Sequence, residues 1–470
     1  MSGEQYTEAS FAYHISARTL LFVPSCRIID LGMASQILLP GFVEPLQPIK
    51  QSRLAVSDAR LPTNTTTRFH RVHRWFNFIA GFSPEFVDQR CAAADLEPNS
   101  LLLDPFAGCG TSLVVAAERG LSAVGYDPHP IFSRICNAKL PNAVSVNVVE
   151  KTHQLLLKGF QHPISTNVLS DSQKAFLEKL YPLDVLETLL GARELLSASD
   201  LADNDLAFLM LSRTVDKCSH SQTDGIYKAP TSKKRHASPA LAATETANLL
   251  LEDLDSLDGA DLQRRADIFR QSSRSMPQVK NESVSIIVTS PPYLNNFDYA
   301  EMTRMLLYFW GIAASWGDIT DKVRGSLIVN TTTALKGHKA LQAHYRANIS
   351  SALHLELDGL VANLGERKRE KSGKKDYDLL VYPYFSQMTD VLREAFRVLR
   401  KGAPIHIVVA DAALYGVHIS TPQLLQSCMQ EIGFSRVECD LMRQRGHRWT
   451  LAKREGSALG LGEYHVRGVK

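Results

Sequence analysis

The chain has 470 residues, of which 44% are hydrophobic and 21% charged, so it can bury a substantial core. Its formal net charge of +3 neither requires nor excludes a nucleic-acid partner, because such binding depends on local basic patches. The sequence has no run of about 20 apolar residues and no CxxC pair among its seven cysteines, which predicts a cytoplasmic chain without a membrane span, disulfide framework or metal site.

Residues 1–67 are predicted to form a partly disordered N-terminal extension. They show little periodicity, and LPTNTTT at their end has the composition of a linker. From residue 68 the chain becomes rich in aromatic side chains. A helix is predicted to begin after Ser83, with Pro84 in its first turn.

An α/β fold is predicted from residue 68 onward. SLLLD, a glycine turn, a helix and SAVGYD form a strand–helix–strand unit within residues 68–145. Residues 146–262 have a mostly helical pattern and are predicted to be an insertion. Strands return within residues 263–470 at ADIF, VSIIVT and PIHIVVAD, followed by a closing antiparallel hairpin. The economical architecture is a doubly wound, mostly parallel sheet with a C-terminal antiparallel hairpin and a large helical insertion.

The stretch DPFAGCGT (104–111) connects the first strand to its helix. Its small residues Ala107, Gly108 and Gly110 let a ligand approach the backbone, and the first N–H groups of the helix point into the same crevice. The stretch fits the GxGxxG fingerprint poorly and lacks the GK[ST] of a P-loop. It therefore predicts a ligand site of another kind.

Two carboxylates limit the kinds of ligand that this site could bind. Asp127 ends the second strand about 20 residues further on, where an acid can accept hydrogen bonds from ribose hydroxyls; the alternative is that it caps the next helix. Asp104 is expected to face the ligand's amino group, because a carboxylate would repel a pyrophosphate but attract an ammonium group. This favours a nucleoside that carries an amino acid, such as S-adenosylmethionine, over NAD.

The apolar run SVSIIV is stopped by SPPY (290–293), in which two prolines prevent a strand or helix from continuing. This turn is predicted to lie at the same sheet edge as DPFAGCGT. Ser290 and the carbonyl of Pro291 can each accept an N–H bond from an exocyclic amine, while Pro292 holds the backbone open. Tyr293 is expected to offer an aromatic face for a base. An ordinary loop or a docking peptide is the alternative.

These stretches resemble motifs of the amino-methyltransferases, which methylate exocyclic amino groups of DNA bases. DPFAGCGT resembles the first motif, with Cys109 where many relatives carry serine, and SPPY resembles the fourth. FxxGxxP resembles the motif beside the cofactor's methionine end. The resemblance covers roughly residues 68–145 and 265–470, and it implies these cofactor-binding residues: Phe78, Gly81, Pro84, Asp104, Pro105, Phe106, Ala107, Gly108, Gly110, Thr111 and Asp127.

The resemblance implies a site-specific methyltransferase that uses S-adenosylmethionine and acts on a flipped base of double-stranded DNA in a prokaryotic cytoplasm. Serine before PPY favours N4 of cytosine, and N6 of adenine is the alternative because either side chain accepts the same hydrogen bond. Two rival functions are an RNA base amino-methyltransferase and a catalytically inactive nucleic-acid-binding protein. A restriction or defence nuclease is expected as a partner.

Two basic stretches are candidate DNA contacts. The first lies in the insertion, which is the candidate target-recognition region, and it contributes Lys228, Lys233, Lys234 and Arg235. The second, GERKREKSGKK, is read as a loop that holds phosphates through Arg367, Lys368 and Arg369. The alternatives are solvated loops and, for the insertion, a dimer surface.

Overall fold

A computed structural model describes residues 64–76, 78, 80–221, 236–256, 265–444 and 461–470. The extension predicted at residues 1–67 lies outside these ranges as far as residue 63. The described chain begins with two 3-10 turns, η1 (Asn64–Phe69) and η2 (His73–Trp75). Trp75 of the second turn is fully buried in the core.

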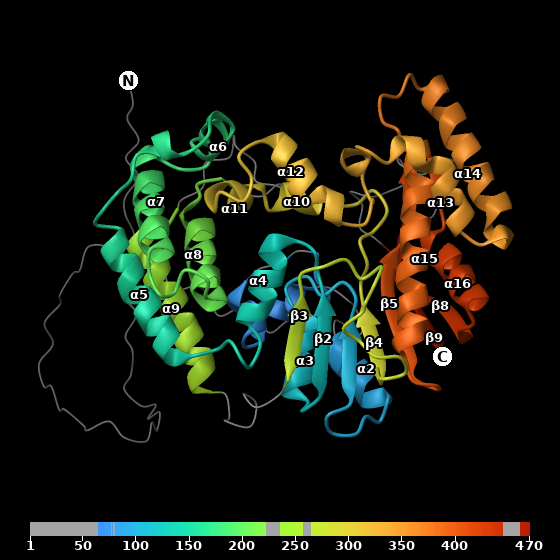
Figure 1. The fold of residues 1–470 in the computed structure, drawn as a ribbon, viewed down its shortest axis with the longest axis horizontal. Helices are drawn as coiled ribbons and strands as arrows, with labels where there is room; N and C mark the ends of the chain where they lie inside the picture. Colours follow the sequence, from blue (N-terminus) through green and yellow to red (C-terminus); the bar gives the residue numbers. More distant parts are fainter. Residues whose placement is uncertain (1–63, 77, 79, 222–235, 257–264, 445–460) are drawn as a thin grey trace, which may run out of the picture. The chain divides into compact units, whose positions relative to one another are not determined.

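A seven-stranded sheet in the order β3-β2-β1-β4-β5-β9-β8 organises the described residues (Figure 1). The first five of these strands run parallel, and β9 is antiparallel to both of its neighbours. The strand order changes direction between β1 and β4, which is where doubly wound sheets bind ligands. The predicted fold class is therefore confirmed. The strands are β1 (Leu101–Asp104), β2 (Ser122–Tyr126), β3 (Ala266–Phe269), β4 (Ile286–Thr289), β5 (Pro404–Ala410), β8 (Ser435–Gln444) and β9 (Gly462–Val469).

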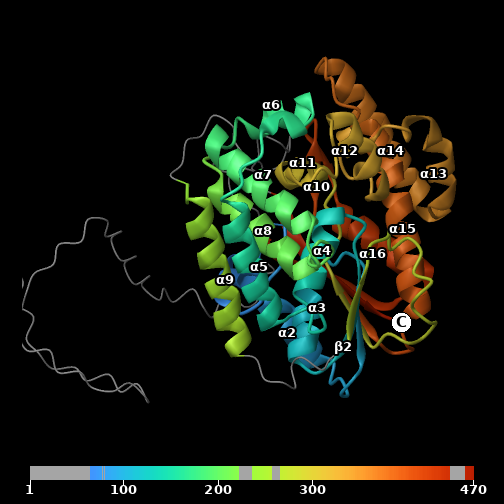
Figure 2. The same cartoon turned by 60° about the vertical axis from the view of Figure 1, so that its left-hand side comes forward.

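Alternate side chains of the central strands serve two hydrophobic cores. Leu102 and Val288 pack in one core with α2 (Pro84–Ala93) and α3 (Thr111–Glu118). Leu103 and Ile287 pack in the other with α15 (Val381–Val398) and α16 (Thr421–Ile432). Figure 2 shows α3 and α16 on opposite sides of the sheet. Because both faces are covered, the central strands read as continuous apolar runs.

Helix α2 begins where the sequence predicts it. Ser83 is its N-cap, and the Ser83 hydroxyl accepts a hydrogen bond from the Phe86 N–H. Pro84 occupies the first helical position, where its missing N–H costs nothing. A small hairpin of β6 (Ala412–Leu414) and β7 (Val417–Ile419) was not predicted, because three-residue strands carry too little periodicity.

Six helices lie between β2 and β3 in the described chain and share one hydrophobic core (teal to yellow-green in Figure 1). One carboxylate links this helical lobe to the N-terminal turns: Asp253 accepts hydrogen bonds from the backbone N–H of Val72, the indole N–H of Trp75 and the guanidinium of Arg74. The helices are α4 (Pro130–Ala138), α5 (Val146–Gly159), α6 (Asp171–Leu177), α7 (Leu183–Ser197), α8 (Asp205–Cys218) and α9 (Pro239–Asp255).

A second group of helices follows β4 and precedes α15. Its longest member, α14 (Ser351–Glu370), includes residues 365–370, so the predicted loop was wrong for this half of the basic stretch, whereas residues 371–375 lie outside any helix or strand. Leu353, Leu357 and Leu364 are buried at helical spacing, and this packing extends the helix into the basic residues. The other helices are α10 (Tyr299–Met302), α11 (Arg304–Phe309), α12 (Trp316–Lys322) and α13 (Gln342–Asn348).

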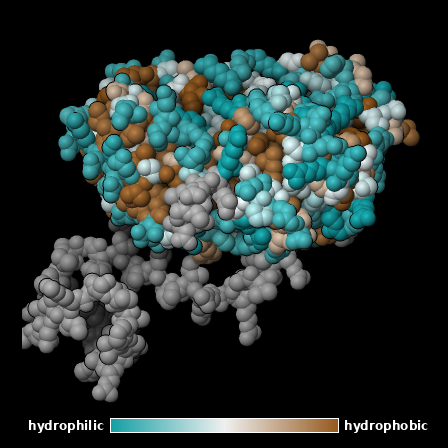
Figure 3. Space-filling model, turned by 60° about the horizontal axis from the view of Figure 1, so that its bottom comes forward, coloured by the Kyte–Doolittle hydropathy of each residue, from teal (hydrophilic) through white to brown (hydrophobic). Residues whose placement is uncertain are grey.

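Among the helices of the described residues, none is long and apolar enough to cross a bilayer. Hydrophilic side chains cover most of the face seen in Figure 3, with smaller apolar areas between them. Scattered apolar groups of this kind are normal on a protein surface.

Candidate active site

The turn between β1 and α3 needs glycine at two positions. Gly108 has φ 51° and Gly110 has φ 87°, both in the left-handed region. A Cβ on Gly108 would lie 3.0 Å from a ring carbon of Phe78, and one on Gly110 would lie 2.7 Å from the Cys136 sulfur. The backbone of this turn is therefore held close to its neighbours, with its amides at the start of α3.

Asp104 is not among the described residues that line the pocket below, although it was predicted to face a ligand. Its side chain is 1% exposed. One carboxylate oxygen accepts from Phe106 N at 3.0 Å and Thr289 Oγ1 at 2.6 Å, and the other accepts from Ser112 Oγ at 2.5 Å. Burial raises the pKa of Asp104 to about 6, against the lowering effect of these bonds. Asp104 joins β1, β4 and α3 instead.

Asp127 lies at the pocket with capacity to accept more hydrogen bonds. Its two oxygens accept from Gly108 N at 3.0 Å and His129 N at 2.8 Å. Each carboxylate oxygen has a further lone pair, so a ligand hydroxyl can still donate to it. Burial raises the pKa of Asp127 to about 7. The N-cap of α4 is His129, whose Nδ1 accepts from Ile131 N at 3.1 Å.

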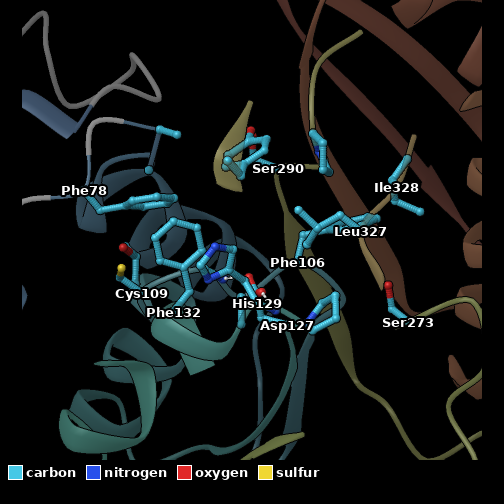
Figure 4. Close-up of a pocket in the computed structure, with 18 of the residues that line it drawn as sticks. Phe78, Phe106, Cys109, Asp127, His129, Phe132, Ser273, Ser290, Leu327 and Ile328 are labelled. Atoms are coloured by element: carbon cyan, nitrogen blue, oxygen red, sulfur yellow. Dashed lines mark hydrogen bonds between the residues drawn. The ribbon is translucent and has the colours of Figure 1, made fainter. Parts of the chain in front are cut away.

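Residues of both the glycine turn and the SPPY turn line one pocket, which has about 760 Å³ of space, including space open to solvent (Figure 4). Nine predicted site residues line it: Phe78, Gly81, Phe106, Ala107, Gly108, Thr111, Asp127, Ser290 and Pro292. Six others are not among its described lining residues: Pro84, Asp104, Pro105, Gly110, Pro291 and Tyr293.

An aromatic wall forms one side of the pocket (Figure 4). The rings of Phe78 and Phe132 meet edge to face at 4.7 Å, and the ring of His129 stacks on Phe132 at 4.2 Å. Burial lowers the pKa of His129 to about 3, so its imidazole is neutral at physiological pH. Its Nε2 is bonded to Thr303 Oγ1 at 2.9 Å, which leaves His129 a structural role.

Several lining residues escaped the sequence analysis. Ser272 and Ser273 follow β3, and the rule that ligands gather beyond carboxyl strand ends would have found them. Ser326, Leu327 and Ile328 follow β4 through a long helical excursion, so nothing in their spacing marks them.

The SPPY turn is held by side chains from distant parts of the chain. Tyr384 Oη donates to the carbonyl of Pro292 at 2.9 Å, and Asn330 Nδ2 donates to the carbonyl of Tyr293 at 3.2 Å. The ring of Tyr293 packs against the core under α15 and α16, and its hydroxyl donates to Glu463 at 2.8 Å. Tyr293 therefore does not offer its face to the pocket as predicted, because its partners turn it inward.

The two candidate DNA-binding patches stay predictions. Lys228, Lys233, Lys234 and Arg235 lie outside the described residues. On α14, Arg367 pairs with Glu370 at 3.0 Å, and Lys368 pairs with Asp376 at 2.5 Å and Asp378 at 3.5 Å. Within the described chain, Arg369 has no ion pair of this kind.

Curated relatives match most of the chain. Type II methyltransferase M.AvaI from Nostoc sp. is 25% identical over 394 residues, which cover 77% of this chain and 79% of the relative. M.BsoBI from Geobacillus stearothermophilus is 23% identical and covers 80% and 81%, and M.MvaI from Kocuria varians is 22% identical and covers 79% and 83%. The chain is related to the Type II DNA methyltransferases.

Other comparisons add little to this assignment. No family model matches the chain. The solved structure of TrmN from Thermus thermophilus aligns with a TM-score of 0.26 and 12% identity, over 82% of this chain and 49% of that one. The fold of the methyltransferase therefore rests on its strand order.

Proposed function

We propose that the chain is a site-specific DNA methyltransferase that moves a methyl group from S-adenosylmethionine to N4 of a flipped cytosine in double-stranded DNA. The observation that carries the proposal is the shared pocket of Gly108 and Ser290. A donor held at the glycine turn and an amine held at the SPPY turn would meet there, so that their reaction becomes effectively intramolecular.

The residues on the glycine side fit the cofactor. The space beside Gly108 is limited by the ring of Phe78, so any side chain here would displace the ring or fill the cradle. We assign ribose binding to the free lone pairs of Asp127, and contact with the rest of the donor to Phe78, Gly81, Ala107 and Thr111. When bound, the donor supplies an electrophilic methyl group on a sulfonium.

The residues on the SPPY side fit an amine. An exocyclic amine is a poor nucleophile because its lone pair is delocalised into the ring, and an acceptor that takes one N–H bond draws it toward sp³ character. Ser290 lines the pocket and is the residue assigned this role. Because Tyr293 packs inward, we assign base stacking to Tyr299, a tyrosine that lines the pocket.

The proposal prefers cytosine to adenine only because the residue before PPY is a serine. Sequencing DNA from cells that express the protein, with a method sensitive to modified bases, reports the base, its position and the surrounding motif together. We expect N4-methylcytosine at one defined sequence. Methyl-adenine at a defined sequence would move the assignment to N6 of adenine, and unmodified DNA would refute a DNA methyltransferase.

A transfer assay with purified protein separates this function from its two rivals. We expect tritium from labelled S-adenosylmethionine to enter duplex DNA and not RNA. Transfer to RNA alone would favour an RNA base methyltransferase, and cofactor binding without transfer would favour an inactive nucleic-acid-binding protein. For target recognition we assign helices α5 to α9, within residues 146–262, and a restriction nuclease is the partner that fits such a protein.

A further inference from the structure

A chain of hydrogen bonds leads from the pocket to the C-terminal hairpin. Ser290 Oγ donates to Tyr293 Oη at 3.4 Å, and Tyr293 Oη donates to Glu463 Oε1 at 2.8 Å. The second oxygen of Glu463 accepts from Arg443 Nε at 2.7 Å. Glu463 lies on β9, is 4% exposed and is not among the described residues of the pocket lining.

The chemistry of these groups fixes the direction of each bond. A guanidinium only donates, and an ionised carboxylate only accepts, so Glu463 accepts from both Arg443 and Tyr293. Burial and the nearby Glu463 raise the pKa of Tyr293, so its hydroxyl keeps its proton. Tyr293 donates this single proton to Glu463.

The direction of these hydrogen bonds determines how the Ser290 hydroxyl can interact with a molecule in the pocket. Since Tyr293 donates its proton to Glu463, its hydroxyl oxygen acts as an acceptor toward Ser290, and the Ser290 hydroxyl donates to it over a long 3.4 Å. The Ser290 hydroxyl then has no proton left for the pocket. Toward a bound base, Ser290 offers lone pairs alone.

We propose that Glu463, through Tyr293, fixes Ser290 as a hydrogen-bond acceptor and so selects a base that carries an amino group over the same base with a carbonyl. An amine donates to Ser290, whereas a carbonyl oxygen would face another acceptor and lose its hydrogen bond. The inference rests on the proposed function. Glu463 is a positioning residue, because it acts on the base only through Tyr293 and Ser290.

The variant Glu463→Gln tests the direction of the hydrogen bonds from Glu463 to Ser290. Arg443 can only donate, so it takes the carbonyl oxygen of the new glutamine and leaves the amide NH₂ to donate to Tyr293. Tyr293 then donates to Ser290, and Ser290 donates into the pocket. Affinities for the cofactor and for two duplexes are measured by titration, with the amino base or its carbonyl analogue (cytosine and uracil, or adenine and hypoxanthine) at the methylated position.

We expect wild-type protein to bind the amino duplex more tightly, and we expect this preference to fall about tenfold in Glu463→Gln. The turnover number should fall about a hundredfold, with the affinity for S-adenosylmethionine unchanged. Glu438→Gln on β8, an exposed ion-pair partner of Arg467, is the matched control and should change neither quantity. Thermal unfolding of each variant shows whether it folds.

Tyr293→Phe provides a second test. It can still decide the question when Glu463→Gln does not fold. Removing the Tyr293 hydroxyl interrupts the series of hydrogen bonds between Glu463 and Ser290. Adding Glu463→Gln to Tyr293→Phe should therefore change the base preference no further. If wild-type protein methylates DNA but Glu463→Gln or Tyr293→Phe keeps the full preference for the amino base, the inference is wrong. If wild-type protein methylates no DNA, the proposed function is wrong instead.

Discussion

The two turns that form the pocket are built in different ways. The glycine turn is held mainly by its own conformation, which needs glycine, and by Asp127, which directly follows the adjacent strand β2 and accepts from Gly108 N. The SPPY turn is held by side chains far along the chain, namely Tyr384, Asn330 and Glu463. Local sequence therefore specifies the first turn, whereas tertiary packing specifies the second, and changes in each should have different consequences.

The largest effect is expected from Gly108→Val. A β-branched side chain at φ 51° is strained, and its Cβ would lie 3.0 Å from the Phe78 ring inside the pocket. We expect the affinity for S-adenosylmethionine to fall at least about a hundredfold, measured by calorimetric titration. Gly359→Ala, on α14 with open space around it, is the control and should leave binding unchanged. Normal binding by Gly108→Val would break the contrast between the turns.

Asp104→Asn should change how stability depends on pH. Burial raises the folded pKa of Asp104 from its ordinary 3.8 to about 6, so the folded state holds this proton where the unfolded state releases it. Stability contributed by this group therefore falls as the pH rises from about 4 to 6, by about 3 kcal/mol, and stays level above that. Urea unfolding across this range should show the wild-type protein losing this amount relative to Asp104→Asn. Parallel curves for the two proteins would contradict it.

Tyr384→Phe should separate catalysis from cofactor binding. It removes the hydrogen bond to the Pro292 carbonyl, which costs about 1 kcal/mol of stability. We expect turnover to fall about tenfold in a tritium-transfer assay, with the affinity for S-adenosylmethionine unchanged. Tyr382→Phe on the same helix loses a hydrogen bond to Asp358 instead, and it should keep full turnover. Equal activity of the two variants would show that the SPPY turn needs no such support.

The smallest effect is expected from Arg369→Gln near the end of α14. If this side chain contacts a DNA phosphate, the slope of log affinity against log salt should fall by about one, with a several-fold weaker affinity at low salt. The control is Lys401→Gln, an exposed residue in the turn before β5, at the strand end away from the pocket. An unchanged slope for Arg369→Gln would remove this patch from the DNA contacts.

Much of the fold could be read from the sequence because its strands are short apolar runs with clear ends. The five parallel strands and the closing hairpin lie where they were predicted. The helical end of α14 was missed because buried leucines on one side of it outweigh its polar composition. Charge patterns report solvent exposure better than they report secondary structure.

The site was predicted at the level of its turns but less well at the level of side-chain direction. Asp104 and Tyr293 are in the expected turns, yet both point to partners that only the tertiary structure brings near: Thr289 and Glu463. Ser273 and Ile328 line the pocket from segments with no local motif. A motif states which backbone reaches the site, whereas the direction of a side chain depends on neighbours from elsewhere in the chain.

The hydrogen bonds of Asp253 limit how this protein can be re-engineered. A carboxylate on α9 holds the turn that ends at Trp75, a few residues before Phe78 enters the pocket. A chimera that takes its helical lobe from another methyltransferase would lose these hydrogen bonds unless residues 64–76 are exchanged together with the lobe. The smallest interchangeable unit is therefore discontinuous in sequence, and grafting α5 to α9 alone should loosen the position of Phe78 in the aromatic wall of the pocket.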